Sequence, residues 1–250
     1  MKEKLYFIGI GGTGMSSVAG LMQELGHHIV GSESGLYEPT KSLLRSFRIK
    51  VNIPYDDNNI LNHPADLYVI ANSLSRGNVE LESVLAKKLN YTSFPELLKN
   101  KVLKHKDPLV VCGTHGKTTT TSLLSYCLEE LNESPGYLIG GYCKNLKKSF
   151  CVGKKLFVIE GDEYDTAFFD KNPKLFHYLP QYLILNNIEF DHADIYNNIE
   201  EIEQVFTTTV ENIKDKSKII ANSEDPRVFS LLKKLKIEEK VRTTSITQNS

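Results

Sequence analysis

A short glycine-rich turn between an apolar run and a helix pattern constrains this chain more than any other feature. Residues 113–118 read Gly-Thr-His-Gly-Lys-Thr, directly after the apolar run Leu109–Cys112. A strand that turns through glycines into a helix is the setting of a phosphate-binding P-loop. The two glycines lie closer together than in the common G-x-x-x-x-G-K-[ST] form, but backbone N–H groups at the helix start still offer a cradle for an anion.

The side chains of this turn point to ATP and Mg²⁺. A lysine here can reach the outer phosphates of the nucleotide, and a threonine hydroxyl can ligate Mg²⁺. A plain glycine turn before a capped helix would explain the glycines, but not their coincidence with a strand, a lysine and a threonine. We therefore expect ATP and Mg²⁺ as cofactors. The predicted ATP-binding residues are Gly113, Thr114, His115, Gly116, Lys117, Thr118 and Thr119.

A second glycine-rich turn, Gly-Ile-Gly-Gly-Thr-Gly, occupies residues 9–14 and also lies between a strand pattern and a helix pattern. Small residues let the backbone approach a pyrophosphate, which the helix start attracts. Glu33 ends the next strand, where an acid meets a ribose hydroxyl in dinucleotide-binding folds. A nicotinamide dinucleotide and a nucleotide diphosphate present the same pyrophosphate. The glycines therefore leave a dehydrogenase and a nucleotide-sugar-binding domain both open.

Apolar strand-like runs alternate with helix-like runs, which predicts β-α-β units and a parallel sheet. The expected strands are 5–8, 28–30, 67–70, 109–112, 157–159, 183–185 and 219–220. The expected helices are 15–25, a segment opened by Pro39, 79–89, 117–131, 202–213 and 228–235. A polar break at Lys101–Pro108 separates two halves. We predict an α/β protein with a Rossmann-like domain over residues 1–106 and an incomplete P-loop ATPase domain over residues 107–250.

Composition narrows the partners and the compartment. A length of 250 residues suits two domains, and a net charge of −1 gives no electrostatic reason to expect nucleic acid or a membrane surface as a partner. No apolar stretch approaches the roughly 20 residues of a membrane helix. The 4 cysteines show no C-x-x-C pair, which argues against zinc and favours reduced thiols in the cytoplasm.

Acidic residues cluster after two of the expected strands. The first cluster is Glu160-Gly-Asp-Glu-Tyr-Asp165, and the second runs from Asn186 to Asp194 and contains His192. Four acids within six residues would repel one another unless a cation sits among them. Because carboxyl ends of parallel strands face the ligand crevice, we expect both clusters beside the P-loop. Oxygen ligands suit Mg²⁺, and an imidazole can join them.

Together these motifs resemble the Mur ligases, the ATP-dependent enzymes that build the peptide stem of peptidoglycan. The pairing of Gly-x-Gly-Gly-x-Gly-Met-Ser at Gly9–Ser16 with Gly-Thr-His-Gly-Lys-Thr-Thr-Thr at Gly113–Thr120 is similar to the branch that acts on muramate. Three further stretches, Asn72–Asn78, Pro135–Gly141 and Glu160–Asp194, resemble a member that adds a whole murein tripeptide in peptidoglycan recycling. The Gly12–Ser16 stretch is shared with the member that adds L-alanine, which stays open as an alternative.

The resemblance implies roles for the matching residues. It implies catalytic roles for Lys117, Asn187 and His192, and Mg²⁺ ligands at Thr118, Glu160 and His192. The residues that it assigns to the UDP-sugar are Gly9, Gly11, Gly12, Thr13, Gly14, Met15, Ser16, Ser32, Glu33, Asn72 and Ser73.

The resemblance also implies a reaction and a missing part. UDP-N-acetylmuramate and the tripeptide would be substrates, and the γ-phosphate of ATP would pass to the muramoyl carboxylate before the peptide amine attacks the acyl phosphate. Mur ligases have three domains, and no counterpart of the third is expected before Ser250. We therefore expect this chain alone to turn over slowly or not at all. A nicotinamide-dependent dehydrogenase and an inactive nucleotide-binding remnant remain the rival hypotheses.

Overall fold

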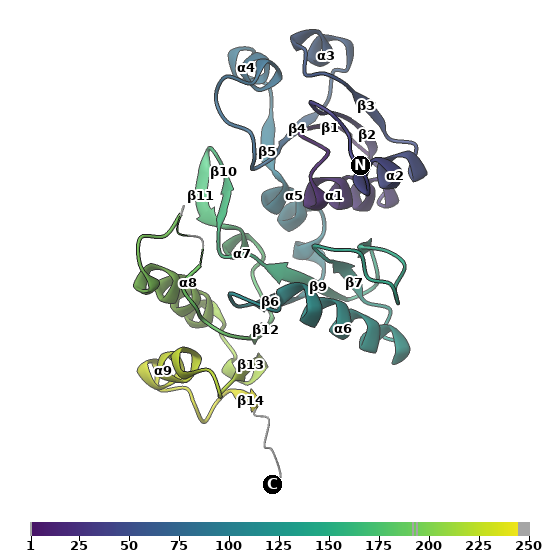
Figure 1. Ribbon diagram of the computed structural model, residues 1–250. Helices are drawn as coiled ribbons and strands as arrows, with labels where there is room; N and C mark the ends of the chain where they lie inside the picture. The colour runs from purple at the N-terminus through teal and green to yellow at the C-terminus, as the bar shows by residue number, and fades with distance from the viewer. Residues whose placement is uncertain (1, 192, 194, 245–250) are drawn as a thin grey trace. The chain divides into compact units, whose positions relative to one another are not determined.

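The computed structural model describes residues 2–191, 193 and 195–244, which divide into two compact units (Figure 1). Unit 1 comprises residues 2–102, 140–152 and 166–171. Unit 2 comprises residues 103–139, 153–165 and the described residues from 172 onward. Two short segments from the second half of the chain therefore belong to the first unit. In the part of the chain that the structure describes, no helix is both long and apolar enough to cross a membrane.

Unit 1 is built on a parallel sheet with the strand order β3-β2-β1-β4-β5. Its strands are β1 (Lys4–Ile8), β2 (His28–Ser32), β3 (Lys50–Asn52), β4 (Leu67–Ile70) and β5 (Tyr91–Ser93), and β8 (Phe150–Cys151) also belongs to this unit. Its helices are α1 (Thr13–Glu24), α2 (Thr40–Ser46), α3 (Asp57–Asn62), α4 (Val79–Ala86) and α5 (Phe94–Lys101).

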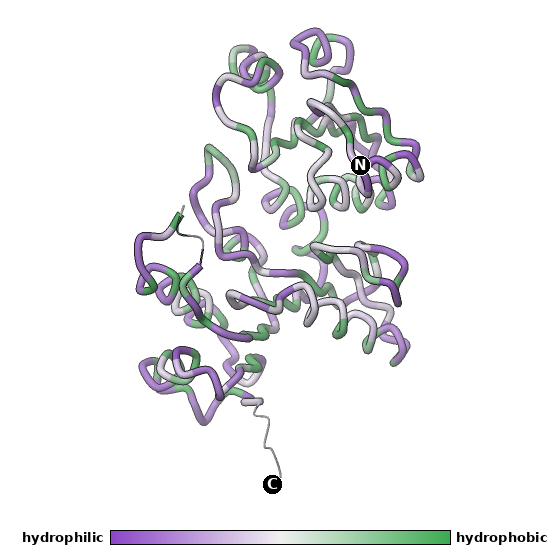
Figure 2. The backbone as a smooth tube through the Cα atoms, viewed as in Figure 1, coloured by the Kyte–Doolittle hydropathy of each residue, from purple (hydrophilic) through white to green (hydrophobic). Residues whose placement is uncertain are grey.

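Alternate residues of the strands bury opposite faces of this sheet, as the two-residue period of a strand requires. Tyr6 and Ile8 of β1 pack with Tyr68 of β4 and with Leu81 and Val84 of α4. The alternating residues of β1 are equally buried on the other face, where α1, α2 and α5 lie (Figure 1). Helices therefore cover both faces, and Figure 2 shows the hydrophobic residues concentrated along the inner strands.

The segment 140–152 packs on α1. Phe150 lies so close to Gly20 that a Cβ added to this glycine would come within 2.3 Å of the ring. The hydroxyls of Ser17 and Ser149 share a buried hydrogen bond of 2.9 Å. A glycine in the middle of a helix costs stability in the absence of such a contact. The close approach of the Phe150 ring explains why a glycine stands at position 20.

Unit 2 contains a second sheet, with the parallel order β14-β13-β12-β6-β9-β7. Its strands are β6 (Asp107–Cys112), β7 (Gly136–Leu138), β9 (Leu156–Gly161), β12 (Tyr182–Leu185), β13 (Ile219–Asn222) and β14 (Arg242–Thr244). Its helices are α6 (Lys117–Glu130), α7 (Lys174–His177), α8 (Ile199–Asn212) and α9 (Pro226–Leu235), with 3₁₀ turns η1 (Leu103–His105) and η2 (Lys216–Lys218). The strands β10 (Asp165–Ala167) and β11 (Asp170–Pro173) form a hairpin. Its residues 166–171 belong to unit 1, and its two ends belong to unit 2.

The crossovers of this second sheet run in opposite directions from β6. The connection through α6 leads toward β7 and β9, whereas the connection through α8 leads away from β12 toward β13. Because parallel crossovers are right-handed, α6 and α8 cover opposite faces. Figure 1 shows α6 on one side of the strands and α8 and α9 on the other.

The predicted α/β class with a parallel sheet is confirmed, and each expected strand and helix is present. The boundaries shift by a few residues, as for α1, which begins at Thr13 rather than at Met15. The expected polar break does not extend to Pro108, because β6 already begins at Asp107. The elements that the periodicity missed are short ones: β3, α3, β5, α5, β7, β8, the β10–β11 hairpin, α7, β14 and the 3₁₀ turns η1 and η2.

Candidate functional site

Both glycine-rich turns lie at the point where the strand order of their sheet reverses. In unit 1 the turn follows β1, with β2 on one side and β4 on the other. In unit 2 the turn follows β6, with β12 on one side and β9 on the other. At such a switch point the loops beyond the strands diverge and leave a crevice for a ligand. The topology therefore places a candidate site in each unit.

The unit 2 turn adopts backbone conformations that require its glycines. Gly113 has a φ of +128° and Gly116 a φ of +80°, a region that residues with a side chain rarely enter. A Cβ at Gly113 would lie 2.9 Å from the backbone nitrogen of Asn187. The turn then enters α6 at Lys117 without a capping side chain. Backbone N–H groups at this helix start are the donors that an anionic ligand satisfies.

The loop after β12 is hydrogen-bonded to the unit 2 turn. The Thr114 hydroxyl donates to the Glu189 carbonyl at 3.1 Å and accepts from the Glu189 N–H at 2.8 Å. The Asn187 side-chain oxygen accepts from the His115 N–H at 2.8 Å, and the Thr114 N–H donates to the Asn187 carbonyl at 3.1 Å. Asn187 therefore shapes the turn through its backbone and its side chain.

Lys117 is held inside the site by oxygen atoms. Its ammonium donates to the carbonyls of Gly113 at 2.9 Å and Thr114 at 3.2 Å. It also lies 2.9 and 3.2 Å from the two carboxylate oxygens of Glu163, whose side chain is 1% exposed. The lysine that should reach the phosphates thus already has a carboxylate partner.

Thr118 and Glu160, two of the three predicted Mg²⁺ ligands, lie together. The Thr118 hydroxyl donates to Glu160 at 2.8 Å at the exposed start of α6. A carboxylate and a hydroxyl are oxygen donors that suit Mg²⁺, which usually keeps water and substrate phosphates as its other ligands. His192, the third predicted ligand, lies outside the described residues. Among the described residues, no three His, Cys, Asp or Glu side chains gather into a metal site.

Lysines from two helices pair with the acidic loop after β9. We expected a cation among these acids, and the structure brings two lysines to them. Lys117 pairs with Glu163, and the buried Lys174 pairs with Asp162 at 3.2 Å. Lys174 also stacks on the Tyr164 ring, 3.9 Å from its centre. Burial lowers the pKa of Lys174, while the neighbouring Asp162 opposes this shift.

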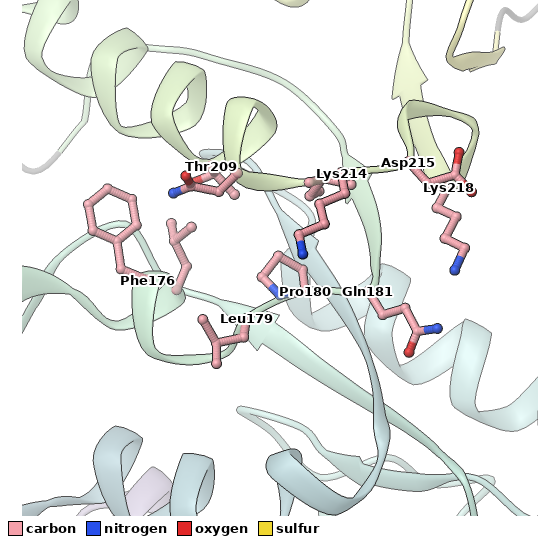
Figure 3. A pocket seen from close by; sticks show the side chains of 11 residues that line it. Phe176, Leu179, Pro180, Gln181, Thr209, Lys214, Asp215 and Lys218 are labelled. Atoms are coloured by element: carbon pink, nitrogen blue, oxygen red, sulfur yellow. The ribbon is translucent and has the colours of Figure 1, made fainter.

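A cavity of about 310 Å³ adjoins the unit 2 turn. His115 and Gly116 line it from the turn, Asn186 and Asn187 from the loop after β12, and Thr244 from β14. A larger cavity of about 640 Å³ lies at the opposite end of the strands. Its lining residues Gln181 and Lys218 precede β12 and β13, and Figure 3 shows that Lys214 reaches into it from the segment after α8. Of these two cavities, the smaller one therefore adjoins the unit 2 turn and the larger one does not.

The unit 1 turn is occupied by a carboxylate. Gly9 has a φ of +81°, and its N–H and that of Ile10 donate to the Ser32 carbonyl at 3.0 and 3.1 Å. The Gly11 N–H donates to the Glu33 carboxylate at 2.8 Å. A Cβ at Gly11 would lie 2.6 Å from the same carboxylate oxygen. The structure therefore brings Glu33 onto the glycine backbone itself.

Other residues predicted for the UDP-sugar lie around this turn. Asn72 and Ser73 are exposed in the loop after β4, and the preceding Ala71 would lie 2.6 Å from a Cβ on Gly9. Gly12 and Thr13 are exposed at the start of α1, whereas Met15, Ser16 and Ser32 are buried.

A buried acid that the sequence analysis did not single out supports the unit 1 turn. Glu80 is fully buried and accepts hydrogen bonds from the Ser32 hydroxyl, from the Asn59 amide at 2.7 Å and from the Asp56 N–H at 3.1 Å. Burial raises the pKa of Glu80, although these donors oppose the shift. Tyr55 donates to Glu33 at 2.6 Å, and burial together with this hydrogen bond raises the pKa of Tyr55.

Known protein families match both units. The Mur ligase family catalytic domain matches residues 4–105, and the Mur ligase middle domain matches residues 111–250. The chain belongs to the Mur ligase family.

Among Mur ligases, similar relatives include the UDP-N-acetylmuramate–L-alanyl-gamma-D-glutamyl-meso-2,6-diaminoheptandioate ligase of Escherichia coli (strain K12). It is 41% identical over 223 residues, which are 89% of this chain and 49% of that protein. The UDP-N-acetylmuramate–L-alanine ligase of Leuconostoc mesenteroides is 33% identical, over 92% of this chain and 48% of that protein. The chain therefore spans about half the length of the curated Mur ligases that it matches.

A solved structure agrees with these similarities. The crystal structure of UDP-N-acetylmuramate:L-alanyl-gamma-D-glutamyl-meso-diaminopimelate ligase (MPL) from Neisseria meningitides superposes with a TM-score of 0.88 at 38% identity. The match covers 94% of this chain and 75% of the Neisseria chain. The Mur ligase fold thus extends over nearly all of the chain.

Sequence reasoning missed three residues of the two candidate sites: Glu163 and Lys174 in unit 2, and Glu80 in unit 1. Glu163 was treated as one of four interchangeable acids, and Lys174 and Glu80 were not identified as parts of a site. The pattern Glu-Gly-Asp-Glu-Tyr-Asp does contain Glu163, but the sequence does not show which acid faces Lys117. Lys174 begins the four-residue helix α7, which is too short for apolar periodicity to reveal.

Proposed function

We propose that this chain forms the UDP-sugar-binding and ATP-binding parts of a ligase that joins UDP-N-acetylmuramate to L-alanyl-γ-D-glutamyl-meso-diaminopimelate in peptidoglycan recycling. The observation that carries the proposal is the unit 2 turn, where Lys117 and the Thr118–Glu160 pair meet at a sheet switch point. The 41% identity with the Escherichia coli enzyme supports the choice of substrates.

The proposed chemistry is phosphoryl transfer followed by amide formation. Lys117 neutralises charge on the transferred phosphoryl group, and backbone N–H groups at the start of α6 bind the phosphates. Glu160 and Thr118 would hold Mg²⁺, which supplies further neutralisation of the phosphate charge. The muramoyl carboxylate takes the γ-phosphate, and the peptide amine then displaces phosphate from the acyl phosphate. Asn187 keeps the turn in shape for this ligand through its contacts to His115 and Thr114.

The unit 1 turn would hold the UDP part of the sugar nucleotide. Gly9, Gly11 and Gly12 present the backbone to the pyrophosphate, and Glu33 would exchange its contact with Gly11 for a ribose hydroxyl. Asn72 and Ser73, exposed beside Gly9, would contact the same ligand. The rival hypothesis of a nicotinamide-dependent dehydrogenase accounts for the unit 1 turn but gives the unit 2 turn no role. The 4 free cysteines are consistent with the cytoplasm as the expected location.

A two-ligand titration tests the proposal. We expect the chain to bind a fluorescent ATP analogue with Mg²⁺ and, independently, UDP-N-acetylmuramate. Lys117→Ala removes the cation that faces the phosphates, so its affinity for the ATP analogue should fall about 100-fold, while UDP-N-acetylmuramate binding stays unchanged. Lys155→Ala is the matched control, because Lys155 is 82% exposed and pairs with Asp107 at the far end of β6.

Two outcomes would contradict the proposal. Unchanged binding of the ATP analogue by Lys117→Ala would remove the P-loop assignment. Displacement of UDP-N-acetylmuramate by NADH at similar concentrations would favour the dehydrogenase. The choice between tripeptide and L-alanine as the second substrate is tested by ADP release in the longest natural protein that contains this chain.

A further inference from the structure

The Lys117 ammonium already donates all its hydrogen bonds to oxygen atoms of the protein in this structure. Four oxygen atoms surround it within 3.2 Å: the carbonyls of Gly113 and Thr114 and both carboxylate oxygens of Glu163. An ammonium group carries three donor protons. A phosphate oxygen can therefore reach Lys117 only by replacing one of its present partners.

Glu163 is held too firmly to follow the lysine. The backbone carbonyls of Asp162, Glu163 and Tyr164 all accept hydrogen bonds. The Leu175 N–H donates to the Asp162 carbonyl at 3.1 Å, and the Lys174 N–H donates to the Tyr164 carbonyl at 3.2 Å. The Tyr196 hydroxyl donates to the Glu163 carbonyl. The Glu163 side chain is 1% exposed, so water cannot take over as its partner without a rearrangement of the loop.

Lys117 is the mobile member of the pair. Its ammonium sits on a flexible four-carbon stem at the first residue of α6, whereas Glu163 is anchored by its own backbone and by its neighbours. When a nucleotide enters, the lysine can turn toward the phosphates while the carboxylate stays in place. The cost of separating this buried pair then counts against nucleotide binding.

We propose that Glu163 is a positioning residue that competes with the nucleotide phosphates for Lys117 and so sets the affinity of the site for Mg-ATP. This inference rests on the proposed nucleotide function of unit 2. Glu163 holds the lysine in its nucleotide-free position and releases it when phosphate oxygens replace the carboxylate. Its negative charge beside the turn also opposes the phosphates directly.

The substitution Glu163→Gln tests the competition. Glutamine keeps the size of the side chain and one oxygen acceptor but removes the charge that holds Lys117. We expect the affinity for a fluorescent ATP analogue with Mg²⁺ to rise about tenfold, because the lysine is released at lower cost. Glu203→Gln is the matched control: it also breaks an ion pair in unit 2, that with Arg227 at 2.7 Å, and should leave the affinity unchanged.

The double variant Lys117→Ala/Glu163→Gln separates competition for the lysine from simple repulsion. In the Lys117→Ala background, Glu163→Gln should raise the affinity far less than tenfold. An equal rise in both backgrounds, or an unchanged or lower affinity of the single variant Glu163→Gln, overturns the proposal. If Lys117→Ala binds the analogue as the parent does, the proposed function fails instead, so the two failures are distinguishable.

A second measurement on the unaltered protein covers the case in which Glu163→Gln does not fold. A crystal structure with a non-hydrolysable ATP analogue and Mg²⁺ should show the Lys117 ammonium on the phosphates and beyond hydrogen-bond distance of Glu163. A bound analogue with Lys117 still in contact with both carboxylate oxygens overturns the proposal.

Discussion

A carboxylate of the same unit lies at each of the two glycine-rich turns, but the two carboxylates contact different groups: a backbone N–H in unit 1 and a lysine in unit 2. In unit 1 the carboxylate of Glu33 accepts the Gly11 N–H and occupies the position that an anionic ligand would take. In unit 2 the carboxylate of Glu163 occupies the ligand's place at Lys117 instead. Each turn thus has a carboxylate partner from its own unit, which the ligand of the proposed function would have to replace. The first turn is satisfied by one acid, whereas the second is tied to two neighbouring loops.

The largest expected effect tests how tightly the second turn is enclosed. Gly113→Ala should lower the free energy of unfolding by about 3 kcal/mol, because φ is +128° and the new Cβ would meet the backbone of Asn187 at 2.9 Å. Urea denaturation measures the loss. Gly12→Ala is the matched control in the first turn: its φ is −67° and its nearest neighbour is 4.0 Å away, so we expect a loss below about 1 kcal/mol. Equal losses would show that the two turns are enclosed alike.

A smaller effect tests the cross-link between the second turn and the loop after β12. Thr114→Val keeps the shape of the side chain but removes the hydroxyl that bonds to both backbone groups of Glu189. We expect a loss of about 2 kcal/mol in the free energy of unfolding, because two polar groups lose their partner. Thr13→Val in the exposed start of α1 should change stability by less than about 0.5 kcal/mol. A Thr114→Val variant as stable as the parent would mean that the loop is held by other contacts.

The smallest expected effect is a pH dependence of stability that comes from Glu80, the buried acid of unit 1. Glu163 faces a lysine, whereas Glu80 faces a hydroxyl, an amide and an N–H, and burial raises its pKa. Because folded Glu80 holds its proton more tightly than unfolded Glu80, stability falls as the pH rises from the unfolded pKa of about 4.5 through the raised folded pKa. Between about pH 5 and 8 the parent should lose more stability than Glu80→Gln, measured by urea denaturation at each pH.

Glu82 on the same helix provides the control for this pH dependence. Its side chain is 37% exposed, and its hydrogen bonds with Arg76 and Gly77 lower its pKa to about 2. The stability that it contributes is lost only as the pH falls toward that value, so Glu82→Gln should leave the pH profile between about 5 and 8 unchanged. If the parent and Glu80→Gln have parallel profiles over this range, Glu80 is ionised at no cost in the folded protein.

Local patterns in the sequence determined the turns and the elements beside them. Glycines at 113 and 116 are needed for positive φ values, and apolar runs such as 67–70 mark buried strands whatever lies around them. The Thr118–Glu160 pair was also predictable, because Thr118 follows β6, Glu160 lies near the carboxyl end of β9, and the carboxyl ends of parallel strands meet at one edge of the sheet. These features depend on neighbours in sequence or on the general geometry of α/β folds.

Only the tertiary structure decided which charges meet. Glu163 is 46 positions from Lys117 in the numbering, and its aim depends on three carbonyl contacts to α7 and Tyr196 that no periodicity encodes. The segment 140–152 belongs to unit 1 because a ring fits against Gly20, a match of shape between distant residues. Alternation of apolar residues specifies faces, whereas the pairing of buried charges depends on distances that exist only once the strands are in register.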